Sequence, residues 1–191
     1  MTISHRLLSY CIPGDILTGT VLKTDPEHVW VDLDGTLAEL PRKRIALSPI
    51  CGTERFRPGM TIHGAVHRID RSQKRIQLTH RELLGTFDEL TCRMEPGQIC
   101  RGIWCRAGCV ELAPNLLAAV RGGSGQSGGA ACVRITRIDR LKCTLSASFV
   151  EDAPRETPPN FTYYITNGRI KHWNYGNCPE NNSARETVFW R

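Results

Sequence analysis

The amino-acid sequence predicts an all-β protein of two tandem small barrels, joined by a short helix and followed by a C-terminal β-hairpin tail. Short stretches with strand periodicity alternate with turn signals such as Asp34-Gly35 and Pro58-Gly59, which favours barrels of short strands. Three segments also return in the same order further along the chain, which indicates a tandem duplication. They are 14–21 at 97–104, 31–33 at 110–112 and 68–79 at 137–146.

The first copy contains four segments with the pattern of short strands. They are Ile16–Val21, Val29–Leu33, Ile62–Ile69 and Ile76–Leu78. The last one follows a turn that is rich in cations, with Arg71, Lys74 and Arg75 close together. Ile76 and Leu78 alternate with polar residues, so one face of this strand is apolar and the other is polar.

Between the two copies the apolar residues change to helical spacing, which predicts a helix, broken or continuous, from about residue 80 to residue 94. The apolar positions are Leu83, Phe87, Leu90 and Met94. Two capping boxes can start it, Thr79 with Glu82 and Thr86 with Glu89, and Gly85 lies between them.

These observations divide the chain into a first repeat at 13–80, a helical connector at 81–95, a degenerate second repeat at 96–150 and a tail at 151–191. The tail begins as a proline-rich linker. It then has the pattern of a hairpin, with Tyr163–Thr166 and Arg169–Trp173 on either side of Asn167-Gly168.

The composition favours a soluble protein with an acidic partner. The formal net charge is +6, and this sign suits nucleic acid or an anionic membrane surface. His5 and Arg6 interrupt the first apolar run, and no apolar stretch reaches the length of about 20 residues that a membrane helix needs. We therefore expect a cytoplasmic protein without a membrane partner. The nine cysteines are odd in number, and reduced thiols are expected.

The residue patterns give no positive sign of catalysis, and we expect no enzyme activity, no metal and no cofactor. Zinc ribbons use Cys-x-x-Cys pairs, which are missing around Cys100, Cys105 and Cys109. His63 and His67 share a strand face but have no third ligand beside them. The glycine-rich run 121–129 lacks the Gly-Lys-Ser/Thr ending of a phosphate-binding loop.

Several of these motifs together resemble the S-one RNA-binding domain, which is named for ribosomal small-subunit protein one and folds as a five-stranded OB barrel. The motifs are Gly14 with Gly19-Thr20-Val21, Val29-Trp30-Val31-Asp32-Leu33, Pro58-Gly59-Met60, Ile69-Asp70 and Arg75-Ile76-Gln77-Leu78-Thr79-His80. The resemblance covers about 13–80 well and about 96–148 in a degraded form.

A second resemblance concerns the connector 79–86, the segment 110–116 and pieces of the tail at 164–168, Trp173 and 186–189. These are similar to an uncharacterised group of multi-repeat proteins from Firmicutes that is described as similar to ribosomal protein S-one. Longer members of that group carry more chain before the first repeat.

Trp30 is the most informative single residue. Val29, Val31 and Leu33 share one face of their strand, which leaves Trp30 on the other face. A base can stack on such a ring, and the resemblance implies this role; alternatively, Trp30 packs under a loop or against the connector. In the second repeat Cys109 takes the place of Trp30, so we expect that repeat to be structural or a weak contributor.

Cations near Trp30 would contact phosphates without reading sequence. The third strand of the resembled family carries a histidine where this chain has Pro41, which is followed by three basic residues; these can equally form a solvated loop. The predicted nucleic-acid-binding residues are Trp30, His28, Arg42, Lys43, Arg44, His67, Arg68, Asp70, Lys74 and Arg75.

The predicted function is RNA binding, with single-stranded RNA as the partner and little sequence preference. The resemblance implies messenger or ribosomal RNA and an association with the ribosome. Two alternatives remain open at this point. One is a structural module for protein–protein interaction, and the other is an RNA-binding accessory of an RNA-processing enzyme.

Overall fold

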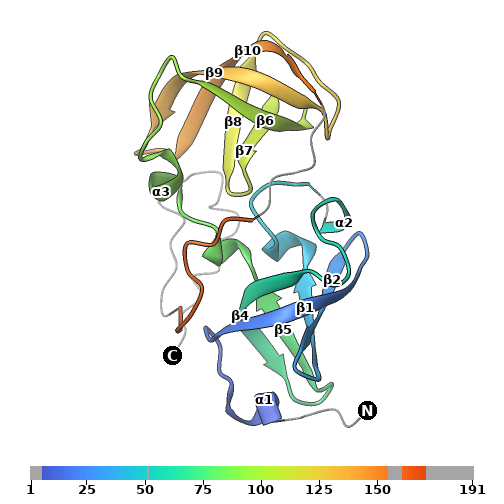
Figure 1. Ribbon diagram of the computed structural model, residues 1–191. Coiled ribbons are helices and arrows are strands. Elements are labelled where there is room, and N and C mark those ends of the chain that lie inside the picture. The colour runs from blue at the N-terminus through green and yellow to red at the C-terminus, as the bar shows by residue number, and fades with distance from the viewer. Residues whose placement is uncertain (1–5, 51, 155–160, 171–191) are drawn as a thin grey trace.

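The computed structural model describes residues 6–50, 52–154 and 161–170 and contains two closed five-stranded barrels (Figure 1). The first barrel has the strand order β1-β2-β3-β5-β4 and the second has the order β10-β8-β7-β6-β9. In each barrel one pair of strands is parallel, β3 with β5 and β8 with β10, and the other pairs are antiparallel. The predicted all-β architecture of two OB-type barrels is therefore confirmed.

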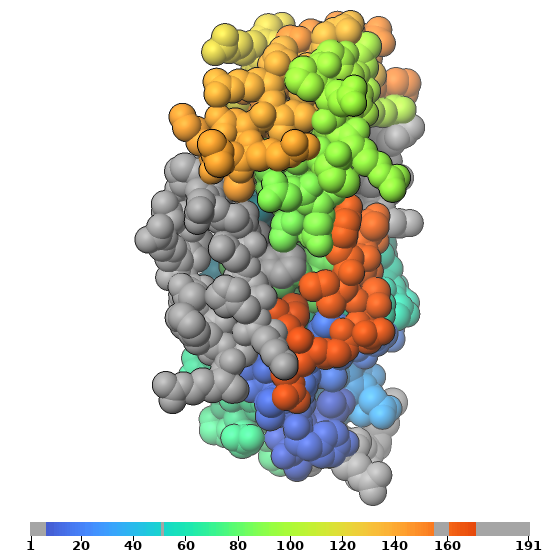
Figure 2. Space-filling model, turned by 90° about the vertical axis from the view of Figure 1, so that its left-hand side faces the viewer, coloured from blue at the N-terminus to red at the C-terminus, as the bar shows by residue number. Residues whose placement is uncertain are grey.

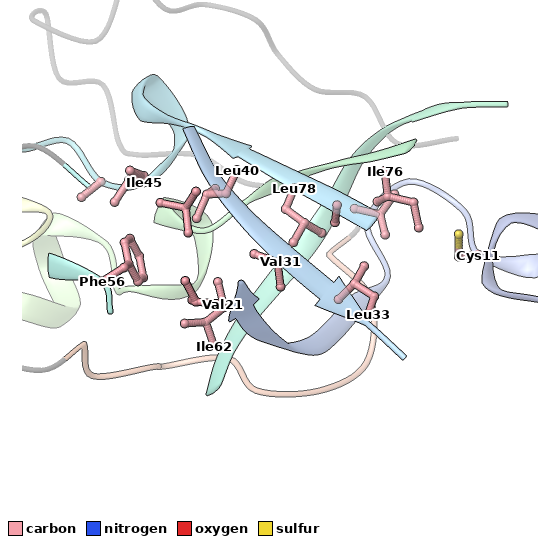
Figure 3. Packing of buried hydrophobic residues seen from close by; sticks show 14 of the residues in the cluster. Cys11, Val21, Val31, Leu33, Leu40, Ile45, Phe56, Ile62, Ile76 and Leu78 are labelled. Carbon is pink, nitrogen blue, oxygen red and sulfur yellow. The ribbon is translucent and has the colours of Figure 1, made fainter. Parts of the chain in front are cut away.

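The elements of the first barrel follow a short helix α1 (Arg6–Tyr10). They are β1 (Ile16–Thr24), β2 (His28–Leu33), β3 (Thr36–Pro41), the 3-10 turn η1 (Arg42–Arg44), α2 (Gly52–Arg55), β4 (Thr61–Asp70) and β5 (Arg75–Thr79). Alternate residues of the strands point inward and form a closed apolar core, in which Val31, Leu40 and Ile76 are fully buried (Figure 3).

The connector is a broken helix, as the glycine between the two candidate caps suggested. It consists of η2 (Arg81–Leu83) and α3 (Phe87–Thr91), with Gly85 between them at a φ of +92°. Thr86 and Glu89 form the expected capping box at the start of α3. The box expected at Thr79 does not form, because its hydroxyl donates to the Glu82 carboxylate instead.

The second barrel repeats the first in backbone detail. Its strands are β6 (Ile99–Arg106), β7 (Cys109–Ala113), β8 (Leu116–Arg121), β9 (Ala130–Asp139) and β10 (Thr144–Ala153). Gly14 and Gly97 share a φ of +92°, and each donates its N–H over 2.7 Å to the carbonyl of Val66 or Ile135. This conformation favours glycine, so the same turn opens both copies.

The register of the last strand corrects the sequence comparison. The match of 68–79 with 137–146 aligns Leu78 with Leu145, but in the structure Leu145 pairs with Ile138 as Ile76 pairs with Ile69. Leu145 is therefore the counterpart of Ile76, and the match was wrong by two residues. Alternating apolar residues allow this error, because a shift of two keeps every side chain on the same face.

The segment 161–170 returns to the first barrel after the second barrel is complete, and it lies against the blue N-terminal part of the chain in Figure 2. Residues 163–166, expected as one arm of a hairpin, form no strand. The Tyr164 N–H donates to the Leu83 carbonyl, and Arg169 forms a single antiparallel bridge with Asp15. The other expected arm, Arg169–Trp173, lies mostly outside the described residues. The tail positions 186–189, which resemble the multi-repeat group, also lie outside them.

Polar side chains buried between the barrels join them. Arg55 from α2 makes an ion pair with Glu111 of β7, and both side chains are 1% exposed. The Asn115 amide accepts from the Leu47 N–H at 3.1 Å and donates to the Arg81 carbonyl at 2.7 Å. Ile50 adds an apolar contact with the second barrel.

His80 ties the first barrel to the returning segment. Its Nδ1 donates to the Ile45 carbonyl at 2.9 Å, so in the neutral ring Nε2 accepts from the Tyr163 hydroxyl, also at 2.9 Å. The ring is fully buried, and this burial lowers the pKa of His80 to about 4.

We expect replacement of Glu111 by glutamine to destabilise the protein by about 3–5 kcal/mol, because it leaves the Arg55 charge buried without a counterion. Denaturant unfolding measures the loss, and Glu151→Gln on the exposed part of β10 is the matched control, with a change within about 0.5 kcal/mol. The double variant Arg55→Met with Glu111→Leu should recover most of the stability. Equal losses for Glu111→Gln and Glu151→Gln would contradict a strong contribution of this pair.

Acid should weaken the fold through His80. Its pKa is lower in the folded state, so between about pH 6.5 and pH 4 the unfolded chain binds the extra proton and the free energy of unfolding falls as the pH falls. A shift from 6.5 to about 4 corresponds to about 3 kcal/mol over that range. The test compares denaturant unfolding at pH 7 and pH 5 for the parent, His80→Gln and the control His28→Gln, whose ring is not among the groups that act on His80. His80→Gln should show the smaller pH dependence; an unchanged dependence would refute this role.

Candidate nucleic-acid interface

The alternation of β2 places Trp30 on the outer face of the first barrel. Val29 and Val31 are 0% exposed and point into the core, whereas Trp30 between them is half-buried. The expected strand faces are thus observed. The environment of the ring then decides what it can contact.

Asp25 holds the indole of Trp30 in place. Its carboxylate accepts from Trp30 Nε1 at 3.1 Å and from the backbone N–H groups of Glu27 at 2.9 Å and His28 at 2.8 Å. These hydrogen bonds, with that of Glu27 the largest cause and that of Trp30 the next, lower the pKa of Asp25. The turn between β1 and β2 therefore fixes the ring before any ligand arrives.

Two cations lie over the Trp30 ring. Lys23 Nζ is 5.3 Å and Arg75 Cζ is 5.5 Å from a ring centroid, which is within cation–π range. The His28 ring lies beside it at 5.7 Å between centroids. The ring thus has two cations over it and the Asp25 carboxylate bonded to its edge.

A row of side chains crosses the outer face from strand to strand. Lys23 pairs with Trp30, Trp30 with Glu39, Glu39 with Gln77, and Gln77 with Arg68. Gln77 Nε2 donates to Glu39 Oε1 at 2.9 Å. The row places amide, carboxylate and guanidinium groups beside one aromatic ring.

Sequence reasoning missed Lys23, Asp25, Glu39 and Gln77. The strand was expected to stop at Val21, whereas β1 continues to Thr24 after a register shift between Val21 and Lys23. Such a bulge leaves no clear signal in the pattern of one strand. The position of Glu39 needed the pairing of β2 with β3, which the sequence alone does not specify.

The basic turn before β5 is held by Asp70. Its carboxylate accepts from the Ser72 hydroxyl at 2.6 Å and the Gln73 N–H at 2.9 Å, and these bonds lower its pKa. Lys74 follows with a φ of +52° and is exposed. Asp70 therefore shapes the turn, and Arg75 directly after it reaches the Trp30 ring on the outer face.

The bulge between Val66 and Arg68 affects the next predicted pair. It places Arg68 opposite Gln77, exposed on the outer face, and leaves His67 half-buried. Arg68 belongs to the surface around Trp30.

The basic run after β3 divides. Arg42 and Lys43 are exposed and, with His28, line a cavity of about 450 Å³. Arg44 is 4% exposed, so its expected role as a surface cation is corrected. A 3-10 helix has about three residues per turn, so three successive side chains point in three directions and one turns inward.

The second barrel has a face that corresponds to the one around Trp30. A Cβ on Gly19 would lie 2.6 Å from the Asp32 carbonyl oxygen, and one on Gly102 would lie 2.4 Å from that of Glu111. These matching close approaches make Glu111 the counterpart of Asp32. Cys109 is therefore the counterpart of Trp30, as the sequence comparison proposed.

Within residues 6–50, 52–154 and 161–170 no group of three or more His, Cys, Asp or Glu side chains is arranged to hold a metal ion. In the same part of the chain no helix is long and apolar enough to cross a membrane.

No protein-family model and no curated protein matches the chain. Solved structures with similar parts include an initiation-factor 2 α-subunit complex with Dim2p and rRNA from Pyrococcus horikoshii (20% identity, TM-score 0.37, 39% of this chain and 46% of that chain). GSP13 from Bacillus subtilis has 21% identity and a TM-score of 0.35 over 36% of this chain and 55% of that chain.

A multidomain Streptococcus pneumoniae protein with nucleic acid binding domains has 15% identity and a TM-score of 0.32, and the match covers 78% of this chain and 55% of that chain. The matched parts thus span about half of each of these three chains. At these sequence identities the similar structures do not indicate a function, which has to be argued from the side chains of this chain.

Proposed function

We propose that the chain binds single-stranded RNA with little sequence preference on the outer face of the first barrel, within residues 13–80. The observation that carries this proposal is the Trp30 ring, held by Asp25 and approached by Lys23 and Arg75. A base stacked on such a ring contributes about 1–3 kcal/mol. The fixed ring loses little freedom on binding, which favours this site over a mobile aromatic.

Lys23 and Arg75 contact the Trp30 ring in the free protein and a phosphate of the RNA in the complex. In the free protein Lys23 and Arg75 lie over the ring; when a base takes that position, each can move to a phosphate of the bound strand. Arg68, Arg42 and Lys43 extend the positive surface to either side. Phosphate contacts and stacking are both tolerant of sequence, so binding is broad and sensitive to salt.

The form of the nucleic acid follows from the same geometry. A ring can stack only on a base whose face is free, and a duplex covers the faces of its bases. RNA rather than single-stranded DNA is proposed from the resemblance of residues 13–80 to the S-one domain. Messenger or ribosomal RNA in the cytoplasm is the partner that this resemblance suggests, without a catalytic role for the chain.

A protein-interaction module is the second candidate. Leu22 and Leu37 are 51% and 36% exposed, and Leu37 lies on β3 beside the Glu39 position. Exposed apolar side chains of this kind suit a protein partner. Titration with single-stranded RNA, double-stranded RNA and DNA oligomers at two salt concentrations separates the candidates, because an interaction module binds none of them.

Trp30→Ala should weaken single-stranded RNA binding by about 1–3 kcal/mol, while Trp30→Phe should recover part of the affinity. Fluorescence anisotropy measures both. Tyr10→Ala, which removes a 65% exposed aromatic ring from α1, is the matched control and should bind as the parent does. A folded Trp30→Ala variant with unchanged affinity would refute the stacking role.

The double variant Lys74→Asn and Arg75→Gln should bind all RNA sequences more weakly and depend less on salt. Asparagine suits the positive φ of position 74. The slope of log K against log salt should fall by about 0.7 for each phosphate contact that is lost. The control removes two exposed charges from the second barrel, Arg134→Gln with Lys142→Gln, and should keep the parent slope. Equal slopes for parent and test variant would mean that the hairpin cations do not touch phosphate.

A further inference from the structure

Two cavities meet where the barrels join. The cavity of about 450 Å³ beside His28, Arg42 and Lys43 shares Leu47 and Pro49 with a second cavity of about 610 Å³. Arg42 Nη2 donates to the Pro49 carbonyl at 3.1 Å, so a cation stands at the border. A strand bound at Trp30 could pass from the first cavity into the second across residues 47–49.

The larger cavity occupies the face of the second barrel that corresponds to the Trp30 face. Register gives the counterparts: Cys109 for Trp30, Ala119 for Glu39, Thr144 for Arg75 and Ser146 for Gln77. All four replacements line the cavity, and each is smaller than the residue it replaces. The volume that the side chains fill on the first barrel is open on the second.

The charge of this second face favours an anion. Arg106 pairs with Cys109 as Lys23 pairs with Trp30, and Arg137 pairs with Ser146 as Arg68 pairs with Gln77, so two cations of this face are kept. Arg106 is exposed and lines the cavity. The position of Glu39 has become Ala119, and Glu111 is buried in its ion pair with Arg55. No carboxylate belongs to the described residues that line the cavity.

An aromatic side chain also lines it, from the connector rather than from the barrel. Phe87 of α3 is 9% exposed, lines the cavity and packs against the core of the second barrel. A volume of about 610 Å³ is within the range of about 300–1,000 Å³ that is usual for small-molecule pockets. The space, the ring and the hydroxyl groups suit one nucleobase.

We infer that the cavity between the barrels is a second nucleotide site, which receives a base of the RNA strand bound at Trp30 and places its phosphate on Arg106. This inference rests on the proposed function. Because Leu47 and Pro49 of the first repeat form part of the wall, the site exists only in the joined barrels. The loss of Trp30 in the second copy thus changes stacking on an open surface into insertion between two surfaces.

The test compares an RNA oligomer of about 4 nucleotides with one of about 12 nucleotides. An OB barrel binds about 4–16 nucleotides, so the short oligomer can occupy the Trp30 face alone, whereas the long one can also reach the second cavity. Fluorescence anisotropy at several salt concentrations is measured for the full chain, Arg106→Gln and the control Arg134→Gln, an exposed arginine of the same barrel. For the longer oligomer, Arg106→Gln should lower the slope of log K against log salt by about 0.7; for the shorter one it should equal the parent.

A second variant tests the cavity without removing a cation. Ala119 is exposed, and Ala119→Glu restores the carboxylate of the first barrel at this position. It should weaken binding of the longer oligomer by repelling its phosphate, and Ala119→Gln should weaken it less. An oligomer with 4-thiouridine at its far end should cross-link to residues 143–146.

The outcomes separate the two proposals. If Trp30→Ala weakens both lengths while Arg106→Gln and Ala119→Glu bind both as the parent does, this inference is overturned and the proposed function stands. If Trp30→Ala leaves both lengths unchanged, the proposed function fails and the second nucleotide site fails with it.

Discussion

The orientation of the two barrels depends on polar groups buried between them. A small separation of the barrels would leave these groups without their partners, at a cost in free energy. The Arg55 and Glu111 side chains have both left water, and each neutralises the other. Asn115 satisfies backbone groups of the first repeat and the connector at the same junction. A buried charge without its partner is costly, so the ion pair forms at only a small range of relative positions of the two barrels. An apolar contact would tolerate a wider range. The cavity lined by both repeats depends on this fixed geometry.

The duplicated copies show how one face can change its use. In the first barrel Asp32 is half-buried on the outer face; in the second its counterpart Glu111 is buried against Arg55. Cys109 is covered in part by Ile50, where Trp30 has cations as neighbours. The barrel core and the opening glycine turn are retained in both copies. Divergence is thus concentrated on the surface, where it changes contacts without disturbing closure.

The core strands and the outward position of Trp30 could be predicted because alternation along a single strand determines them, as Val29, Trp30 and Val31 show. The break at Gly85 and the cap at Thr86 were equally local. Lys23 and Glu39 were missed because their closeness to Trp30 depends on pairing between strands and on a bulge. Arg44 was wrongly predicted to be a surface cation, because basic residues in short turns are usually exposed, whereas its side chain is buried in the 3-10 turn. The register of β10 was ambiguous because apolar residues recur every second position.

The returning segment 161–170 has a consequence for the order of folding. Arg169 Nε donates to Asp15 over 2.6 Å, a contact that joins residues 154 positions apart. Ile170 donates to the Gly14 carbonyl, at the turn that opens the first barrel. During synthesis the strands of the first barrel can pair long before these residues leave the ribosome, but His80 and Phe56 receive Tyr163 and Phe161 only afterwards. The first repeat to be made can therefore reach its final packing only after the whole second repeat has been synthesised.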